Sequence, residues 1–445
     1  MSMKRIVDHY LSEWKKEPNR KAILLRGARQ SGKTYSVRQL GKSFSEYVEI
    51  NFEKEPQYAG LFAQDLDPQR ILRDLRVFTK KNLHPGKCLL FFDEVQEAPA
   101  AIKALRYFYE ELPALHVIAA GSLIEFALQN IGLPVGRVDS LHMYPLSFLE
   151  FLVAREGKSL AELLLDHDPG QPLPAIYQEK LWALLGEYLV TGGMPEVIKA
   201  WLDDKEPGHI ARKHATLISG FRQDFNKYAK KHQVKYVDLV FNEIPSNLGC
   251  RFVYNRLPGD WKSRELAPAL ELLCKAEVAH KVTQSAGNGV PLKAQSRPDH
   301  FKLLFLDVGL AQAMLGLDPG PWLLHPLEAV VNKGSVAEAF IGQELLAYHS
   351  LWAKKELFYW QRDAPSSSAE VDYLLEREGA VFPLEVKSGK SGTLKSLRLF
   401  LSEKSGTVTQ GYRFSHHPFS ICDNLHTYPL FAVPCIFQDL PRDWM

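Results

Sequence analysis

Short apolar runs alternate with longer mixed segments in the first third of the chain. Four of these runs have the length and composition of buried strands, namely residues 22–25, 47–52, 88–92 and 115–119. The segments between them, such as 36–44 and 100–112, are long enough for crossover helices. Uninterrupted apolar strands separated by helices are typical of a parallel sheet that is covered on both faces. The pattern therefore predicts an α/β fold for this part of the chain.

The rest of the chain has a different pattern. In residues 175–235 the apolar positions have mostly helical spacing. Residues 263–282 also have helical spacing and end in a β-like tail. A Gly-containing turn and a further strand at 301–305 come next. This order of helix, strand, loop and strand indicates a winged helix-turn-helix. A helix and three short strands then follow, namely 335–349, 357–360, 370–375 and 380–386. We predict three parts: 1–165, a helical and winged-helix region at 175–315, and a small α/β domain at 322–445.

Composition narrows the class of protein. Of the 445 residues, 46% are hydrophobic and 24% are charged, as in ordinary globular proteins, which excludes intrinsic disorder. No apolar run approaches the ~18 residues of a membrane span, and the N-terminus lacks the apolar core of a signal peptide. The five cysteines have no paired spacing that would indicate a zinc site or a disulfide framework. We expect a cytoplasmic protein that does not bind membranes.

The net charge of +2 is unevenly distributed. Residues 227–302 hold thirteen Lys and Arg against seven Asp and Glu, a local balance of +6 that leaves −4 for the rest. Such a segment favours an anionic partner, although a solvated helical face explains it equally well. The basic side chains that we single out are Lys227, Lys230, Lys231, Lys235, Arg251, Arg256, Lys262 and Arg264.

One motif follows the first predicted strand. It fits G-x-x-x-x-G-K-[ST] and comprises Gly27, Ala28, Arg29, Gln30, Ser31, Gly32, Lys33 and Thr34. Such a loop between a strand and a helix cradles phosphates with its backbone N–H groups and with the positive end of the helix dipole. Lys33 would reach the β- and γ-phosphates of ATP, and the Thr34 hydroxyl would bind Mg²⁺.

The strand at 88–92 ends in two carboxylates, Asp93 and Glu94. Acids at the carboxyl end of a buried parallel strand lie beside the crevice in which α/β sheets bind ligands. We predict that Asp93 holds Mg²⁺ and that Glu94 is the general base for the attacking water.

Two further candidates are less specific. Ser122 follows the fourth predicted strand, where it would sense the γ-phosphate or orient the water; an N-cap for the next helix explains it equally well. Arg137 would supply a cation to the γ-phosphate, either in cis or from a neighbouring subunit.

Residues 369–387 predict an acidic β-hairpin. With the turn centred between Glu378 and Gly379, Asp372 faces Glu385, and Lys387 lies on the same face. Two opposed carboxylates and a lysine would hold a hard cation and activate water in a phosphodiesterase. The alternative is a salt-bridged hairpin that faces solvent.

Taken together, these motifs resemble the prokaryotic AAA family ATPases that carry the C-terminal domain of unknown function 4143. The matching stretches include 27–34, 89–94, AAGS at 119–122, 144–151, 188–195, 301–310, 333–338 and 370–372. The resemblance implies an ATP-binding AAA module, a winged-helix region and a nuclease-like domain. The hairpin is similar to the core of the PD-(D/E)XK nuclease superfamily, and Glu338 on the preceding helix is a further ligand by that analogy. No proline precedes Asp372, which departs from the pattern.

We therefore expect an Mg²⁺-dependent ATPase that controls how its C-terminal half engages nucleic acid, with DNA favoured over RNA. The resemblance to nucleases implies a second Mg²⁺ or Mn²⁺ at the C-terminal site. The resemblance to AAA proteins implies assembly into a homo-oligomer. The alternative function is a nucleotide-dependent switch that binds a protein partner and has an inactive nuclease-like domain.

Overall fold

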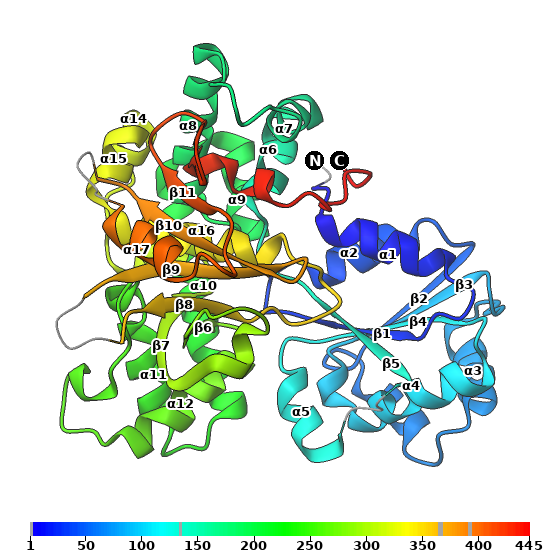
Figure 1. Ribbon diagram of the computed structural model, residues 1–445. Coiled ribbons are helices and arrows are strands. Elements are labelled where there is room, and N and C mark those ends of the chain that lie inside the picture. Colours follow the sequence, from blue (N-terminus) through cyan, green and yellow to red (C-terminus); the bar gives the residue numbers. More distant parts are fainter. Residues whose placement is uncertain (1–2, 133–135, 364–367, 390–393) are drawn as a thin grey trace.

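The computed structural model describes residues 3–132, 136–363, 368–389 and 394–445. Two β-sheets organise these residues (Figure 1). The first sheet lies in the N-terminal third, blue to cyan in Figure 1, and the second belongs to the C-terminal half, green to red. No helix in the described ranges is long and apolar enough to cross a membrane.

The N-terminal sheet is entirely parallel and has the strand order β2-β3-β4-β1-β5. This confirms the predicted α/β fold. The strands are β1 (Ala22–Arg26), β2 (Glu46–Asn51), β3 (Cys88–Asp93), β4 (His116–Ala120) and β5 (Val138–His142). The sequence pattern did not predict β5, because this edge strand has the mixed sequence VDSLH and half-buried positions.

Alternate residues of the central strands enter two separate cores. Ile23 and Phe91 belong to one hydrophobic cluster, whereas Leu24 and Phe92 belong to the other. Burial on both faces explains why these strands are continuous apolar runs without polar alternation. The helices of this part are α1 (Ile6–Lys16), α2 (Lys33–Gly41), α3 (Pro68–Thr79), α4 (Pro99–Glu111), α5 (Ile124–Ile131), α6 (Phe148–Glu156) and α7 (Lys158–Leu165).

A helical region follows, as the sequence predicts. The last turn of its long helix α10 lies near the N-terminal sheet, since Lys227 pairs with Glu53 just after β2. Helices α11 and α12 lie at the bottom left of Figure 1. The helices are α8 (Ala175–Thr191), α9 (Pro195–Asp204), α10 (Pro207–Tyr228), α11 (Val234–Glu243) and α12 (Ser263–Lys275).

The second sheet is mixed, with the order β12-β13-β11-β10-β9-β8-β6-β7. Its strands are β6 (Ala279–Ser285), β7 (Ser296–Phe305), β8 (Leu357–Gln361), β9 (Glu370–Arg377), β10 (Ala380–Lys387), β11 (Gly411–Ser415), β12 (Ser420–Cys422) and β13 (Leu425–Pro429). Because β6 pairs with β8, this sheet crosses the boundary that we predict between residues 315 and 322.

The pairing of β6 with β8 bears on the predicted winged helix, because the wing would be the hairpin of β6 and β7. The predicted order of α12, β6, loop and β7 is present, but β6 is held on both sides, by β7 and by β8. The hairpin is therefore part of the large sheet and not a free wing. The winged-helix interpretation stays a prediction.

Further short helices complete the chain. The α-helices are α13 (Val308–Met314), α14 (Gly320–Leu324), α15 (Pro326–Asn332), α16 (Gly334–Ala347) and α17 (Lys395–Glu403). The 3₁₀ segments are η1 (Pro56–Phe62), η2 (Val95–Glu97), η3 (Pro245–Asn247), η4 (Tyr254–Arg256), η5 (Leu292–Gln295) and η6 (Leu430–Ile436).

Buried polar contacts tie the N-terminal part to the rest of the chain. The N–H of Leu146 donates to the carbonyl of Gly193 at 2.7 Å, and the N–H of Gly193 donates to Asp307 at 2.5 Å. The N–H of Phe148, at the start of α6, donates to both carboxylate oxygens of Glu344 at 3.0 Å. Apart from Glu344 of the second-sheet region, these residues lie in the stretches 144–151, 188–195 and 301–310, so the structure gives those motifs a role in packing.

Candidate functional site

The phosphate-binding loop joins β1 to α2, as its motif requires. Gly27 has a φ of 145° and Gly32 a φ of 102°, values that L side chains rarely adopt. A Cβ on Gly27 would also clash with the carbonyl oxygen of Met143. The two glycines therefore allow the loop to close tightly at the carboxyl end of β1.

Lys33 and Thr34 begin α2 and point to different partners. The Lys33 ammonium donates to the carbonyls of Gly27 and Ala28 at 2.9 and 2.8 Å, inside the loop. Burial lowers the pKa of Lys33, while nearby acids, Glu94 first, act in the opposite direction. The Thr34 hydroxyl donates to the carboxylate of Asp93 at 3.1 Å.

The carboxylates at the end of β3 lie next to this loop. Asp93 also accepts a hydrogen bond from the side-chain amide of Asn51 at 3.1 Å, at the end of the neighbouring strand β2. Burial raises the pKa of Asp93, and the charge of Glu94 raises it further. Glu94 has a φ of 49° and accepts a hydrogen bond from the Gln96 amide at 2.7 Å.

The donor set suits a hard divalent cation. A hydroxyl oxygen from Thr34 and a carboxylate from Asp93 lie within hydrogen-bond distance of each other beside a phosphate-binding loop. Mg²⁺ is bound in nucleotide sites by one or two such oxygens together with phosphate oxygens and water. The residues present therefore fit the Mg²⁺ ion that the motifs predict.

Ser122 lies in the loop after β4, and β4 stands between β3 and β1 in the sheet. The N-cap of α5 is Leu123, and no side chain caps this helix. The N-cap interpretation of Ser122 is therefore wrong. Its role beside the γ-phosphate stays a prediction.

Arg137 does not lie near the phosphate-binding loop. It immediately precedes β5, whose first residue Val138 pairs with Ala22 at the amino end of β1, whereas the loop follows the carboxyl end. Five strand residues separate those ends, about 16 Å. Arg137 instead pairs with Glu110 of α4 at 2.6 Å. The cis role that we predict for Arg137 is therefore wrong, and only the role in a neighbouring subunit stays a prediction.

Helix α10 reaches the same site, which the sequence did not predict. The guanidinium of Arg29, in the loop, pairs with Asp224 of α10. One turn later, Lys227 pairs with Glu53, just after β2, at 2.9 Å. Asp224 is 5% exposed. A buried acid in an amphipathic helix is the signal that could have indicated such a contact.

The acidic hairpin has the predicted register. Ala380 pairs with Arg377 and Leu384 with Tyr373, so opposed residue numbers sum to 757. Both turn residues, Glu378 and Gly379, have positive φ, as in the tight hairpin turns that match strand twist. Next to the pair of Leu384 and Tyr373, the Asp372 carboxylate accepts a hydrogen bond from the N–H of Val386 at 2.7 Å.

The structure brings the four predicted C-terminal residues into one cluster and adds Glu370 and Lys302. Lys387 pairs with Glu385 on β10. Glu338 of α16 approaches Lys302, a residue of β7 to which we assigned no role. Lys302 interrupts the apolar run FKLLF, and a lysine in such a run is the signal that the sequence contained.

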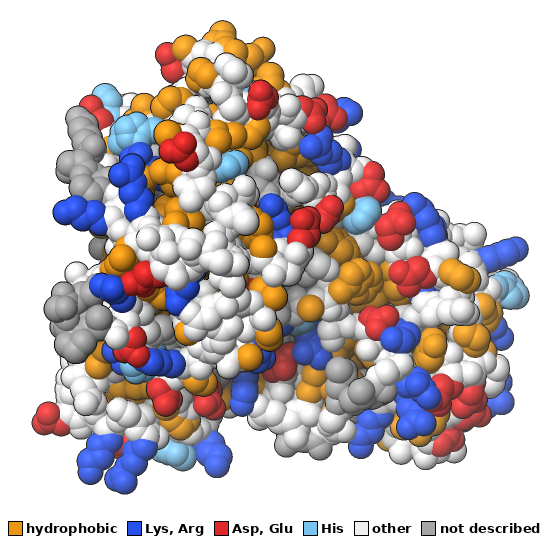
Figure 2. Space-filling model, viewed as in Figure 1, with side chains coloured by type: hydrophobic (Ala, Val, Ile, Leu, Met, Phe, Trp, Pro, Cys, Tyr) orange, Lys and Arg blue, Asp and Glu red, His pale blue; other side chains and the backbone are white. Residues whose placement is uncertain are grey.

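The exposed basic residues around α11 and α12 stand largely without acid partners. Among the described residues, no ion pair is formed by Lys230, Lys231, Lys235, Arg251, Arg256, Lys262 or Arg264, and all of them are exposed. In the space-filling view, blue side chains gather at the lower left, over these helices (Figure 2). This surface retains the net positive charge that the sequence indicates.

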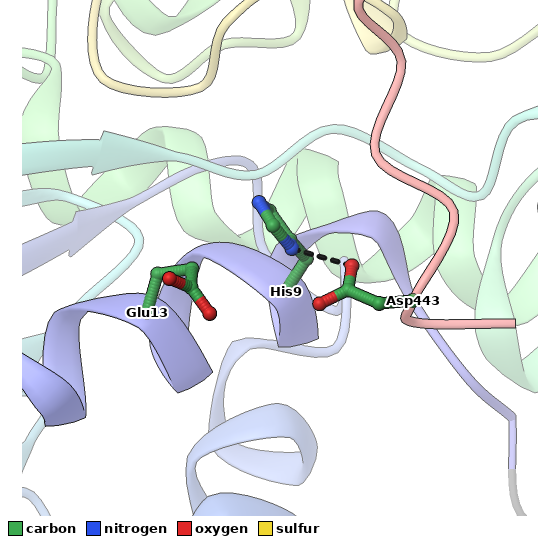
Figure 3. A group of neighbouring side chains, drawn as sticks. All are labelled: His9, Glu13 and Asp443. Carbon is green, nitrogen blue, oxygen red and sulfur yellow. Dashed lines mark hydrogen bonds and ion pairs between the residues drawn. The ribbon is translucent and has the colours of Figure 1, made fainter.

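A group of possible metal ligands lies elsewhere, at His9, Glu13 and Asp443 (Figure 3). His9 Nδ1 lies 2.5 Å from Asp443 Oδ1, and Glu13 is one turn further along α1. Both acids are exposed. The pair of His9 and Asp443 attaches the C-terminal segment to α1, and nothing further indicates a bound ion.

Comparison with known families agrees with this geometry. Residues 19–152 match the AAA domain family, and residues 333–435 match the domain of unknown function DUF4143. The chain contains an AAA-type P-loop ATPase domain and a C-terminal DUF4143 domain. Between them, residues 183–320 match a further domain of unknown function, DUF8612. The predicted resemblance to the AAA ATPases is thus confirmed, whereas the nuclease resemblance stays a prediction.

Three solved structures are similar to parts of this AAA ATPase. The Walker-type ATPase paby2304 of Pyrococcus abyssi is 16% identical, with a TM-score of 0.44, over 69% of this chain and 94% of that one. Hsp104 of S. cerevisiae in its ADP complex is 13% identical, with a TM-score of 0.28, over 61% of this chain and 38% of Hsp104. Drosophila ORC bound to DNA is 13% identical, with a TM-score of 0.24, over 70% of this chain and 85% of the matched ORC chain. At TM-scores below 0.5 these likenesses support no functional conclusion. No curated protein matches the chain.

Proposed function

We propose that this AAA ATPase hydrolyses ATP by in-line attack of water on the γ-phosphate. The observation that carries the proposal is the convergence of Lys33, Thr34, Asp93 and Glu94 at the carboxyl edge of one parallel sheet. Lys33 neutralises charge on the β- and γ-phosphates, and the loop from Gly27 to Gly32 binds them with its N–H groups. Glu94, positioned by Gln96, polarises the attacking water.

Thr34 and Asp93 hold Mg²⁺ in this proposal. The ion, when bound with ATP, neutralises charge that develops on the phosphate oxygens. Asn51 donates to Asp93 and keeps its carboxylate directed at Thr34. Ser122 contacts the γ-phosphate or the water from the end of β4, which lies between the strands that carry the loop and the acids.

We further propose that nucleotide occupancy controls how the C-terminal half engages nucleic acid, with DNA favoured. Two observations support this. Arg29 joins the phosphate-binding loop to Asp224 of α10, so that a change at the loop acts on the helical region. The exposed basic residues that follow α10 lack acid partners and suit a phosphate backbone.

The coupling is tested with Glu94→Gln, which should bind ATP without turning it over. We expect its retention on immobilised duplex DNA at low salt to change at least about threefold between ATP and no nucleotide. Retention should fall steeply as salt rises, because phosphate contacts release counterions. Lys33→Ala is the control, since it should not respond to ATP. Absence of any salt-sensitive retention would contradict the nucleic-acid part of the proposal.

The second candidate is a nucleotide-dependent switch that binds a protein partner and whose nuclease-like domain is inactive. The observation that favours it is Lys302, whose ammonium lies among the acids that a nuclease would use. Failure to bind DNA at low salt, together with ATP-dependent capture of one defined partner, would favour this candidate. In both cases we propose a cytoplasmic protein, with homo-oligomerisation as an option.

A further inference from the structure

The C-terminal cluster contains a cation supplied by the chain itself. The Lys302 ammonium lies 2.8 Å from Glu338 Oε1, 2.5 Å from Glu370 Oε1 and 3.8 Å from Asp372 Oδ1. These acids come from α16 and β9, whereas Lys302 comes from β7 at the edge of the same sheet. One ammonium group thus joins three carboxylates from two other elements.

The position of Lys302 is buried and closely packed. Its side chain is 3% exposed, and its ammonium lies 5.3 Å from the centre of the Tyr359 ring. The other carboxylate oxygen of Glu338 occupies space beside Gly249, where a Cβ would lie only 2.9 Å from it. Removing a buried ammonium from such surroundings leaves uncompensated acids, which is strongly unfavourable.

The pKa shifts agree with a permanent charge on this lysine. Burial acts to lower the pKa of Lys302, but the carboxylates of Glu338, Asp372 and Glu370 raise it above its usual value. Lys302 therefore stays protonated at neutral pH. A divalent ion would have to displace a charged group that is already paired.

The cluster still has more acid than base. Four carboxylates, those of Glu338, Glu370, Asp372 and Glu385, face two ammonium groups, those of Lys302 and Lys387. Glu385 is 2% exposed, and among the described residues no group bonds to its Oε2. Burial and then the charge of Asp372 raise the pKa of Glu385 to about 7. Glu385 Oε2 is thus available as a metal ligand, but the Lys302 ammonium already occupies the space between the other acids.

The nuclease resemblance implies a metal held by Asp372, Glu385 and Glu338, and the residues present do not fit it. We propose that Lys302 is the resident cation of this cluster, in place of the divalent ion, and that the cluster binds metal only when Lys302 is removed. The wild-type domain is then a metal-independent platform that does not cleave phosphodiesters. This inference rests on the cluster alone and goes beyond the proposed ATPase function.

The test compares thermal unfolding of the full chain with Mn²⁺ and with EDTA, without nucleotide. For wild type we expect the same Tm in both. For Lys302→Ala we expect a lower Tm in EDTA that rises by about 5 °C in millimolar Mn²⁺, because ligand binding to the folded state stabilises it. Rescue by Mn²⁺ is a readout that a lysine with only a packing role would not give.

Two variants make the result specific. Lys281→Ala removes a half-buried lysine of the adjacent strand β6, whose ammonium lies over the Phe301 ring and forms no ion pair with any described acid, and its Tm should not respond to Mn²⁺. Lys302→Ala combined with Asp372→Asn removes a metal ligand, and the rescue should disappear. A Tm of Lys302→Ala that is the same in Mn²⁺ and in EDTA would overturn the proposal.

If Lys302→Ala does not fold in EDTA, refolding it in Mn²⁺ decides the question. Recovery of the folded chain only with Mn²⁺ supports the proposal, and failure in both conditions contradicts it. Electron paramagnetic resonance of wild type with Mn²⁺ gives an independent check. Micromolar binding to wild type that Asp372→Asn abolishes would also overturn it. None of these readouts depends on ATP turnover or DNA retention, so this inference and the proposed function fail separately.

Discussion

The phosphate-binding site and the C-terminal cluster contain the same kinds of side chain and arrange them differently. In the first, the Lys33 ammonium donates to carbonyls of its own loop, and the Asp93 carboxylate contacts the Thr34 hydroxyl. In the second, the Lys302 ammonium is directly paired with carboxylates. A lysine that does not pair with the acids leaves them available for a metal ion. A lysine buried among them replaces the ion.

The largest effect that would sharpen this comparison is on ATP turnover. We expect Glu94→Gln to lower kcat at least about 100-fold while ATP still binds, because an amide does not accept the proton of the attacking water. Steady-state phosphate release measures turnover, and nucleotide titration measures binding. Glu97→Gln is the matched control, because Glu97 is exposed three residues further on. Equal turnover in Glu94→Gln and wild type would show that Glu94 is not the base.

Exchanging the two lysines for alanine tests the comparison directly. We expect Lys33→Ala to weaken ATP binding at least about tenfold with little loss of stability, since phosphate charge is no longer neutralised. Lys302→Ala should leave ATP binding unchanged and lower the free energy of unfolding by about 3 kcal/mol, because it leaves buried acids unpaired. Nucleotide titration and denaturant unfolding give the two quantities. A large loss of ATP affinity in Lys302→Ala would break the distinction between the sites.

A third acid site shows what burial without a lysine does. Glu344 is 0% exposed, and burial raises its pKa to about 8. Its unfolded pKa is near 4.5, so between those values the folded state binds more protons and stability falls as pH rises. We expect wild type to lose up to about 1.4 kcal/mol per pH unit relative to Glu344→Gln between pH 5 and 8. Denaturant unfolding across that range measures it, and parallel pH profiles would contradict the raised pKa.

A smaller effect is expected where α10 meets the phosphate-binding loop. Asp224→Asn removes the charge that pairs with Arg29. We expect it to change the difference in DNA retention between ATP and no nucleotide about two- to fivefold, because the link between loop and helix is weakened. The control is Asp203→Asn on α9, whose exposed acid pairs with Lys199 and with no other residue in the described ranges. An unchanged response in Asp224→Asn would mean that the signal does not pass through this contact.

The smallest effect belongs to Arg137. Its ion pair with Glu110 is exposed, and such pairs contribute about 0–1 kcal/mol. We expect Arg137→Ala to leave the stability and the turnover of a monomer unchanged. A loss of turnover that appears only at concentrations where the chain assembles would support the role in a neighbouring subunit. A loss in the monomer would contradict the position that the structure gives Arg137.

Local sequence was sufficient for features that depend on neighbouring residues. The strands β1, β3 and β4 follow from apolar runs, because strands buried on both faces have few polar positions. The loop at 27–34 follows from its glycines and from Lys33, and the register of the hairpin follows from the turn at Glu378 and Gly379. In these cases the spacing along the chain already sets the geometry.

Contacts between distant segments could not be derived in that way. The pairing of Arg29 with Asp224 joins residues 195 positions apart, and that of Lys302 with Glu338 joins residues 36 positions apart. Lys302 is on β7, which pairs with β6, and the acids are on β9, which pairs with β8. The pairing of β6 with β8 brings these two halves of the sheet together. The sequence determined which groups are present and which fold carries the ATP site. The tertiary structure decided which lysine meets which acid, because a charge leaves water only where packing brings its partner within hydrogen-bond distance.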